Sequence, residues 1–296
     1  MPICTLIAAD SLESGMFSEA KDRLAHAGCI PGAVDWLAEA KAIDISFEGN
    51  LSHARAALAG LEDRFDIAVH HGGHRRKRIL VSDMDSTMIT VECIDELADY
   101  AGIKPEIAAI TERAMAGELD FAEALKARVA LLAGLDENVV AQCLRERVRP
   151  MPGAEILVRT MTGWGAHAVL VSGGFTSFTG PVATMLGFAE VHANVLEIKD
   201  GRLTGTLATN IVDASTKRAV LLSAAETRGI DLCSAIAVGD GANDLPMIAA
   251  AVSGNGLGVG YHPRPQLAQA ANFSVRHNDL TALLFAQGVK PDEWLH

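Results

Sequence analysis

The chain of 296 residues has no continuous apolar run long enough to cross a membrane. Residues 1–10 contain no basic segment of the kind that opens a secretory signal peptide, so we expect no such leader. Cysteine is sparse, with five widely spaced residues and no pair at C-x-x-C spacing. These features argue against a disulfide framework or a zinc site. They favour a protein of the reducing cytoplasm.

Positive charge is also scarce, since 25 Lys and Arg residues face 37 Asp and Glu residues and leave a net charge of −12. This charge argues against a general nucleic-acid-binding protein. The hydrophobic fraction of 49% is typical of a globular protein with a large core. A chain of this length favours two domains, or one domain with a large insertion.

Residues 1–72 are predicted to form a small α+β domain. Strand patterns cover 4–8, 42–47 and 66–70, helical patterns cover 12–27 and the stretch that Ser52 would cap, and 33–40 leaves room for another strand. This order is that of a ferredoxin-like unit, and it contains no catalytic motif. Residues 73–78, rich in glycine and basic side chains, are predicted to be a solvated linker.

The most informative stretch follows this linker. The apolar run Ile79–Val81 predicts a short buried strand that carries Asp83 and Asp85 to the carboxyl edge of a sheet. Two carboxylates this close repel each other unless a cation lies between them, and Mg²⁺ is the natural candidate. An aspartate beside such an ion can attack phosphorus. On this motif alone, an ordinary acidic surface turn remains an alternative.

A second predicted strand, His167–Val171, ends in Ser172, Gly173 and Gly174. A serine followed by two glycines allows backbone N–H groups to approach a phosphate closely. A Gly-Gly turn without any ligand is the alternative.

A third predicted strand, 235–239, ends in the motif Gly-Asp-Gly-x-Asn-Asp, which supplies Asp240, Asn243 and Asp244. Ahead of it, Lys217 stands at the head of a predicted helix, where a lysine is ordinarily solvated. Because parallel strands end at one edge of the sheet, we expect all of these side chains to meet there.

Between the first strand and the second, residues 91–149 have the periodicity of four helices, the second of which is predicted to end near Gly117. An insertion of this kind can close over a small substrate and exclude water. Glu92, Phe121 and Arg128 stand out within it, although each would ordinarily be a surface charge or a core ring.

In their order, these motifs resemble those of the haloacid dehalogenase-like phosphohydrolases, over about residues 78–288. The flanking sequences Val-Glu-Cys-Ile-Asp-Glu-Leu-Ala and Val-Ser-Gly-Gly-Phe resemble those of phosphoserine phosphatases in particular. The resemblance implies an α/β fold: a doubly wound, Rossmann-like parallel sheet formed by 79–90 and 150–296, with a helical cap at 91–149. The N-terminal unit is similar to the ACT-like domain of many bacterial members.

The resemblance also implies roles for the site residues. Asp83 is the expected nucleophile and Asp85 the general acid and base. Mg²⁺ is expected at Asp83, the backbone carbonyl of Asp85 and Asp240, with Asp244 in support. Substrate is expected to contact the core through Ser172, Gly173, Lys217 and Asn243, and the cap through Glu92, Phe121 and Arg128.

The expected activity is Mg²⁺-dependent hydrolysis of O-phospho-L-serine through an aspartyl phosphate, the last step of serine biosynthesis. Two alternatives stay open. One is a different small-molecule phosphatase or a phosphotransferase of the same superfamily, for example with homoserine as acceptor. The other is an amino-acid-sensing regulatory protein. We expect a small phosphoester as partner and neither nucleic acid nor a membrane, and the sequence leaves open whether a homodimer forms.

Overall fold

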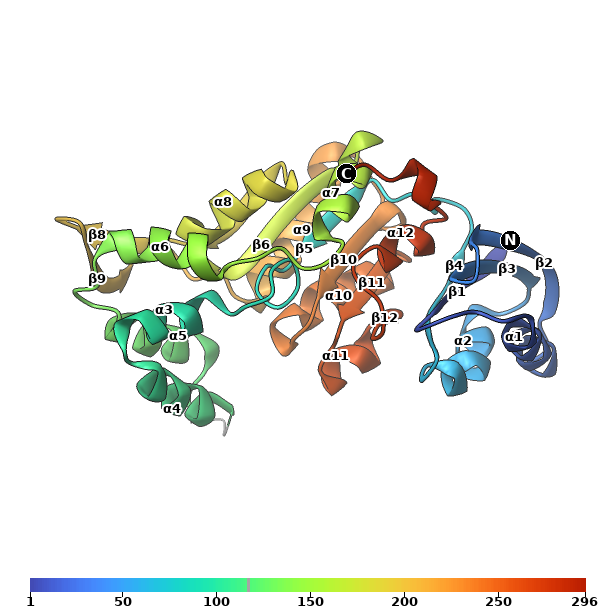
Figure 1. Ribbon diagram of the computed structural model, residues 1–296, viewed down its shortest axis with the longest axis horizontal. Helices are drawn as coiled ribbons and strands as arrows, with labels where there is room; N and C mark the ends of the chain where they lie inside the picture. Colours follow the sequence, from blue (N-terminus) through green and yellow to red (C-terminus); the bar gives the residue numbers. More distant parts are fainter. Residues whose placement is uncertain (116–117) are drawn as a thin grey trace.

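The computed structural model describes residues 1–115 and 118–296, so the predicted helix end near Gly117 lies outside the described residues. Figure 1 shows three parts in a row, with the N-terminal domain at one end, a parallel sheet in the middle and a helical cap at the other end. Among the described helices, none has the length and apolarity that a membrane span requires.

The N-terminal domain is an antiparallel sheet with helices packed against it. Its strands, in the order β2-β3-β1-β4, are β1 (Pro2–Ala8), β2 (Ile30–Ala38), β3 (Ala42–Glu48) and β4 (Phe65–His71). Its helices are α1 (Ser14–His26) and α2 (Leu51–Leu58), followed by the short turn η1 (Ala59–Leu61). The α+β, ferredoxin-like prediction is confirmed. The predicted cap Ser52 is wrong, because Oδ1 of Asn50 accepts the N–H groups of Ser52 and His53 instead.

The central sheet is parallel, as predicted. Its strands, in the order β12-β11-β10-β5-β6-β7, are β5 (Ile79–Ser82), β6 (His167–Phe175), β7 (Glu190–Asn194), β10 (Ala235–Gly239), β11 (Leu257–Tyr261) and β12 (Phe273–Val275). This order places β5 between β10 and β6, so the three strands that carry the motifs are neighbours.

Helices cover both faces of this sheet, because its strands are apolar on both sides. On β5, Leu80 packs toward α7 (Ala154–Gly163), α8 (Thr176–Leu186) and α12 (Ala282–Ala286). Its neighbours Ile79 and Val81 pack toward α9 (Ala214–Arg228), α10 (Leu245–Ser253) and α11 (Pro265–Ala270). The doubly wound arrangement is thus confirmed.

Helix α8 and strand β7 were missing from the sequence prediction. The segment Thr-Ser-Phe-Thr-Gly-Pro at the start of α8 is typical of a turn, and Pro181 lies inside the helix. The helical signal was nevertheless present, because Phe178, Val182 and Leu186 recur at intervals of four residues and are all buried.

The cap contains α3 (Cys93–Ala101), α4 (Lys104–Met115), α5 (Phe121–Leu131) and α6 (Glu137–Arg147), and the predicted hairpin of β8 (Leu196–Lys199) and β9 (Arg202–Leu207) packs against α5. Its two connections to the core run side by side. Ile89 and Pro150 form an isolated antiparallel bridge, and the N–H of Met151 donates to the carbonyl of Met88 over 2.8 Å. The cap therefore leaves and re-enters the core at neighbouring points.

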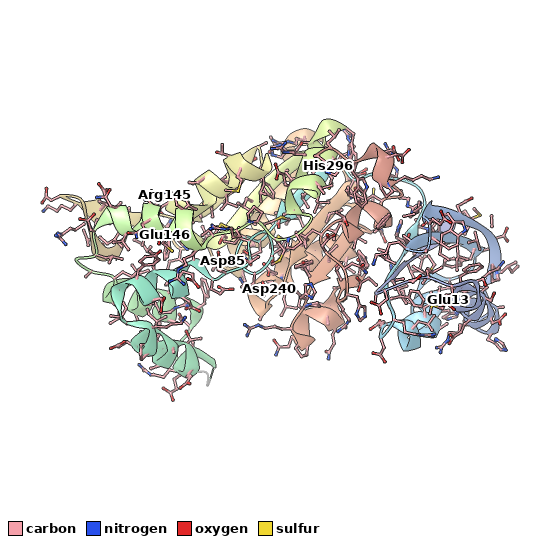
Figure 2. The ribbon with its side chains drawn as sticks, in the orientation of Figure 1. Glu13, Asp85, Arg145, Glu146, Asp240 and His296 are labelled. Carbon is pink, nitrogen blue, oxygen red and sulfur yellow. The ribbon has the colours of Figure 1, made fainter. Side chains whose placement is uncertain are left out.

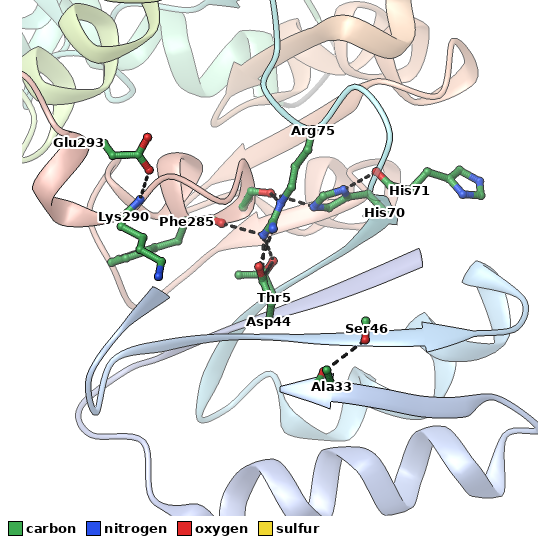
Figure 3. Close-up of polar contacts among 11 residues, drawn as sticks. Thr5, Ala33, Asp44, Ser46, His70, His71, Arg75, Phe285, Lys290 and Glu293 are labelled. Carbon is green, nitrogen blue, oxygen red and sulfur yellow. Dashed lines mark hydrogen bonds and ion pairs between the residues drawn. The ribbon is translucent and has the colours of Figure 1, made fainter. Parts of the chain in front are cut away.

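The predicted linker between the N-terminal domain and the core is exposed at Gly73, His74, Arg76 and Arg78, but two of its side chains are not solvated. Lys77 is 4% exposed, and the guanidinium of Arg75 points into the boundary between the two parts. There, Nη2 of Arg75 donates to Asp44 over 2.6 Å and to Thr5 over 3.0 Å. It also donates to the carbonyl of Phe285, a residue of α12 (Figure 3). The basic run thus serves as an inter-domain contact, which its composition alone could not reveal.

Two further side chains of β4 join the N-terminal domain to the core. Nε2 of His70 donates to the carbonyl of Ala286 over 2.8 Å (Figure 3). Asp66 is fully buried and accepts the backbone N–H groups of Arg276 and Asn278 at 2.7 and 3.0 Å. Because such buried polar groups are costly when unpaired, the two parts are held together in a defined orientation.

We expect Asp44→Ala to lower the free energy of unfolding by about 3 kcal/mol, because it leaves the guanidinium of Arg75 buried without its carboxylate. Urea unfolding followed by circular dichroism measures the change. The matched control is Arg113→Ala, which breaks an ion pair whose side chains are 55% and 58% exposed and should cost less than about 1 kcal/mol. Equal losses in the two variants would contradict this account of the domain boundary.

Candidate active site

The catalytic motifs meet at one edge of the central sheet because β10, β5 and β6 are adjacent and parallel. Asp83 follows β5, Ser172 lies in β6 near its carboxyl end, and Asp240 follows β10. Figure 2 shows Asp85 and Asp240 together between the sheet and the cap, and both line one cavity. The sequence prediction that these strand ends converge is therefore consistent with the structure.

A buried lysine lies at the centre of this edge. Nζ of Lys217, in the first turns of α9, is 2.8 Å from Oδ1 of Asp83 and 2.8 Å from Oδ1 of Asp244. The three side chains are at most 5% exposed. Burial alone would lower the pKa of Lys217, but the charges of Asp83 and Asp244 outweigh it and hold the pKa above its ordinary value. The ammonium group is therefore charged.

The two oxygens of Asp83 have different surroundings. Oδ1 receives Lys217 and also the backbone N–H of Met84 at 2.8 Å. In the described part of the chain, Oδ2 has only a 3.5 Å contact with Nδ2 of Asn243. Oδ2 is thus the oxygen that remains available for chemistry.

Asp244 stabilises the turn that follows β10. Its Oδ2 accepts the backbone N–H groups of Asp240 and Gly241, each at 3.2 Å. A Cβ added at Gly239 would lie 2.3 Å from Cγ of Asp244, so only glycine fits at the end of β10. These contacts fix the turn that presents Asp240.

The edge can hold a divalent cation. Carboxylate oxygens of Asp83, Asp240 and Asp244 all lie within 4.8 Å of one another. Among the described residues, the Asp240 carboxylate accepts no hydrogen bond, and burial followed by the charge of Asp83 raises its pKa to about 6. An unpaired carboxylate beside another carboxylate is a fitting ligand for a hard cation. Both oxygens of Asp244 already have protein partners, so this residue contributes mainly support.

Asp85 has a very different environment from Asp83. Oδ1 of Asp85 is buried and finds no hydrogen-bond partner within residues 1–115 and 118–296. Burial raises the pKa of Asp85 well above its ordinary value, and the charges of Glu92 and Asp83 add to the shift. The adjacent Ser86 has a φ of 55°, a strained conformation for a non-glycine residue, and its hydroxyl donates to Glu92 over 2.7 Å. The turn therefore presents a carboxyl group whose protonated form is favoured over that of an ordinary aspartate.

The loop Ser172–Gly174 forms the opposite wall, and it needs small residues. A Cβ at Gly174 would lie 3.0 Å from Oγ of Ser172 and 3.3 Å from Oδ2 of Asp85. Sequence reasoning missed the residue that holds this loop. Asn194 is fully buried, donates to the carbonyl of Gly173 over 2.7 Å and accepts the N–H of Val212 over 2.8 Å. It is the last residue of β7, and its position gave no signal because that strand was not predicted.

A cavity of about 370 Å³ lies between this edge and the cap. It brings together most of the residues that the sequence singles out: Asp83, Asp85, Glu92, Phe121, Arg128, Ser172, Gly173, Asp240 and Asn243. Lys217 and Asp244 do not line the cavity and lie buried behind its wall.

The cap contributes a cation and an aromatic ring. Nε of Arg128 on α5 donates to the carbonyl of Ala124 over 3.3 Å, while burial lowers the pKa of its guanidinium. Phe121 begins the same helix, and Cζ of its ring would lie 3.1 Å from a Cβ at Gly173. The ring therefore lies against the glycine loop of the core, and the cap contacts the core at this point.

Arg264 is a lining residue that sequence reasoning missed. It precedes α11, and its backbone N–H donates to the carbonyl of Asp240 over 3.0 Å. The only sequence signal was its place after β11, at the edge of the sheet that carries the other site residues.

Known proteins share this architecture. Residues 80–249 match the family model described as haloacid dehalogenase-like hydrolase. A phosphoserine phosphatase of Albidiferax ferrireducens is 45% identical over 70% of this chain and 88% of its own length. One of Streptomyces coelicolor is 45% identical over 77% of this chain, which spans only 55% of that relative.

Similarity also extends to the three-dimensional arrangement. The crystal structure of a probable phosphoserine phosphatase from Vibrio cholerae, in unliganded form, superposes with a TM-score of 0.77 and is 33% identical. The superposition covers 97% of this chain, including the N-terminal domain, and 85% of the other. The family resemblance drawn from the motifs is confirmed: the chain belongs to the phosphoserine phosphatases, a branch of the haloacid dehalogenase-like hydrolases.

Proposed function

We propose that this protein hydrolyses O-phospho-L-serine to L-serine and phosphate, with Asp83 as nucleophile and Mg²⁺ as cofactor. The observation that carries the proposal is the contrast between two neighbouring carboxyl groups. Oδ1 of Asp83 is paired with a buried ammonium group and its Oδ2 has only a 3.5 Å contact with Asn243, whereas Oδ1 of Asp85 is buried and makes no hydrogen bond among the described residues. Such a pair supplies a nucleophile and an acid in one site.

In the first step, Oδ2 of Asp83 attacks phosphorus and the bond between phosphorus and the seryl oxygen breaks. Asp85 donates its proton to that oxygen, and an aspartyl phosphate remains on Asp83. In the second step, Asp85 takes a proton from water as the water attacks phosphorus. Phosphate leaves, and the carboxylate of Asp83 is restored.

The surrounding groups of the core stabilise charge on the phosphoryl oxygens. The Ser172 hydroxyl and the N–H of Gly173 are the proposed donors, and Asn243 holds Asp83 in place. Lys217, expected from the sequence to contact substrate, lies behind the cavity wall and contributes its charge through Asp83. Mg²⁺ would be held by Asp83, the backbone carbonyl of Asp85 and Asp240, and when bound it neutralises phosphate charge as a Lewis acid. The carboxylate cluster supports this assignment.

The cap supplies the preference for serine. Apart from its phosphate, phosphoserine is a zwitterion, and burying either charge unpaired is costly. We assign its ammonium group to Glu92 and its carboxylate to Arg128, both of which line the cavity. Phe121 excludes water. Serine biosynthesis in the cytoplasm is the proposed setting, because all five cysteines, each a described residue, are free thiols.

We expect Asp83→Asn to lower turnover by about 10⁴-fold or more, the scale seen when one member of a catalytic unit is lost. Rapid-quench labelling of the native enzyme with ³²P-phosphoserine should find an acid-stable, hydroxylamine-labile label on Asp83. Asp200→Asn, a conservative change in the β8–β9 hairpin, should retain full turnover. A label on Ser172 would overturn the assignment of the nucleophile.

Metal dependence and reaction type are tested together. Phosphate release from phosphoserine should exceed release from other small phosphoesters, stop in EDTA and return with Mg²⁺. Asp240→Asn should raise the Mg²⁺ concentration for half-maximal activity by at least about 10-fold, since a ligand is lost. Asp35→Asn, on the exposed edge strand β2, should leave that concentration unchanged.

Repeating the assay with homoserine as an acceptor distinguishes hydrolysis from phosphotransfer. Transfer in preference to hydrolysis would identify a phosphotransferase, and no turnover with any phosphoester would favour a regulatory protein.

We expect Arg128→Ala to lower kcat/KM for phosphoserine, mainly through KM, because the substrate carboxylate loses a buried partner. The loss should correspond to about 2–4 kcal/mol of transition-state binding free energy. Slow turnover of p-nitrophenyl phosphate, which has no carboxylate, should scarcely change. Lys126→Ala removes an exposed cation from the same helix and should affect neither substrate. If Arg128→Ala reduces both activities equally, Arg128 supports the fold or the phosphate site and not serine recognition.

A further inference from the structure

A second cavity, of about 320 Å³, lies at the boundary between the N-terminal domain and the core. We call it the seam cavity. Helix α2, η1 and β4 line it from the N-terminal domain, and α11 and β12 line it from the core. Helices α2 and α11 lie on either side of this boundary in Figure 1. Among the described residues, it shares no lining residue with the catalytic cavity.

The wall of the seam cavity combines polar and apolar groups. Ile67 and Ala268 contribute apolar surface from the two parts, while Phe65 and Phe273 are almost fully buried behind it. Its volume is at the lower end of the range found for small-molecule sites. A cavity of this size with both polar and apolar groups suits a small organic molecule that carries a charged and an apolar part.

The charged groups of the cavity are mostly cationic. Arg55 and Arg276 line it together with one carboxylate, Glu62, in a protein whose net charge is −12. The Arg276–Glu62 pair is loose, at 3.7 Å and with side chains 40% and 50% exposed. Arg55 donates from Nε and Nη2 to the carbonyl of Val69 at 3.2 and 2.6 Å, and within the described chain its Nη1 makes no hydrogen bond. A donor is thus available to an anion.

The seam cavity is connected to the catalytic edge by the short helix α11. The N–H of Ala268, in the cavity wall, donates to the carbonyl of Arg264 over 3.0 Å. In turn, the N–H of Arg264 donates to the carbonyl of Asp240 over 3.0 Å. Two backbone hydrogen bonds therefore separate the seam cavity from a residue of the carboxylate cluster, and Arg264 itself lines the catalytic cavity.

We propose that the seam cavity is a binding site for a small organic carboxylate, held by Arg55 and Arg276 with its apolar body against Ile67 and Ala268. Because both parts of the protein form the site, bound carboxylate stabilises their association. Because α11 joins the site to Arg264 and Asp240, occupancy changes the affinity of the catalytic cavity for its substrate.

The binding test is calorimetric titration of the full-length protein with acetate, pyruvate and L-alanine, and separately with inorganic phosphate. We expect at least one carboxylate to bind. Arg276→Gln and Arg55→Met should each weaken that binding by about tenfold, the loss of one charge-assisted contact. Arg276→Gln changes a side chain that is 40% exposed, so it tests the site even if Arg55→Met is unstable.

Two controls locate the binding. Arg145→Ala removes an exposed arginine of the cap helix α6, labelled in Figure 2, and should leave the affinity unchanged. Arg128→Ala should also retain the binding, which shows that the carboxylate does not occupy the catalytic cavity. The proposal is overturned if no carboxylate binds, if only inorganic phosphate binds, or if both seam variants bind as tightly as the native protein.

The link to catalysis has its own test, which rests on the proposed function. The carboxylate that binds should change KM for phosphoserine in the native enzyme and leave it unchanged in Arg276→Gln. An unchanged KM at saturating carboxylate would overturn the link through α11. Absence of phosphoserine turnover would instead count against the proposed function, because the calorimetric result does not depend on activity.

Discussion

The catalytic edge depends on one buried ammonium group, that of Lys217, placed between the carboxylates of Asp83 and Asp244. Asp240 lies nearby as well, so without this cation Asp83 and Asp244 would be buried carboxylates with no cation paired to either among the described residues. Each buried charge that is left without its partner costs several kcal/mol of stability. The two ion pairs therefore fix the start of α9 against the ends of β5 and β10. The strand order, with β5 between β10 and β6, brings these residues together.

The same charge separates the chemistry of two aspartates that are two residues apart. Lys217 and the N–H of Met84 occupy one oxygen of Asp83, whereas Asp85 lies beyond the reach of both and beside the carboxylate of Glu92. Identical side chains thus differ in role through their surroundings. The two aspartates differ because of the residues around them, so substituting either aspartate would not reproduce the difference.

The sequence was sufficient where the signal is local. Short apolar runs followed by Asp83, Ser172 and Asp240 identified the strands, their common edge and the site. Contacts between segments distant in the chain were not predictable in this way. The burial of Arg75 against Asp44 depends on how two domains dock, and a run of basic residues looks the same in solvent and in an interface. The linker prediction did not include this contact for that reason, and the roles of Asn194 and Arg264 also depend on contacts between distant segments.

The paired connections of the cap have a consequence for diversification. Ile89 and Pro150 are bridged, so the inserted helices begin and end at one place on the core. A segment whose ends already meet can be lengthened, shortened or exchanged without altering the register of the sheet, as in tolerated domain insertions. The residues proposed to break the bond belong to the core, and those proposed to bind the organic part of the substrate belong to the insertion. Replacement of the inserted helices can therefore change the substrate selectivity while the reaction stays the same.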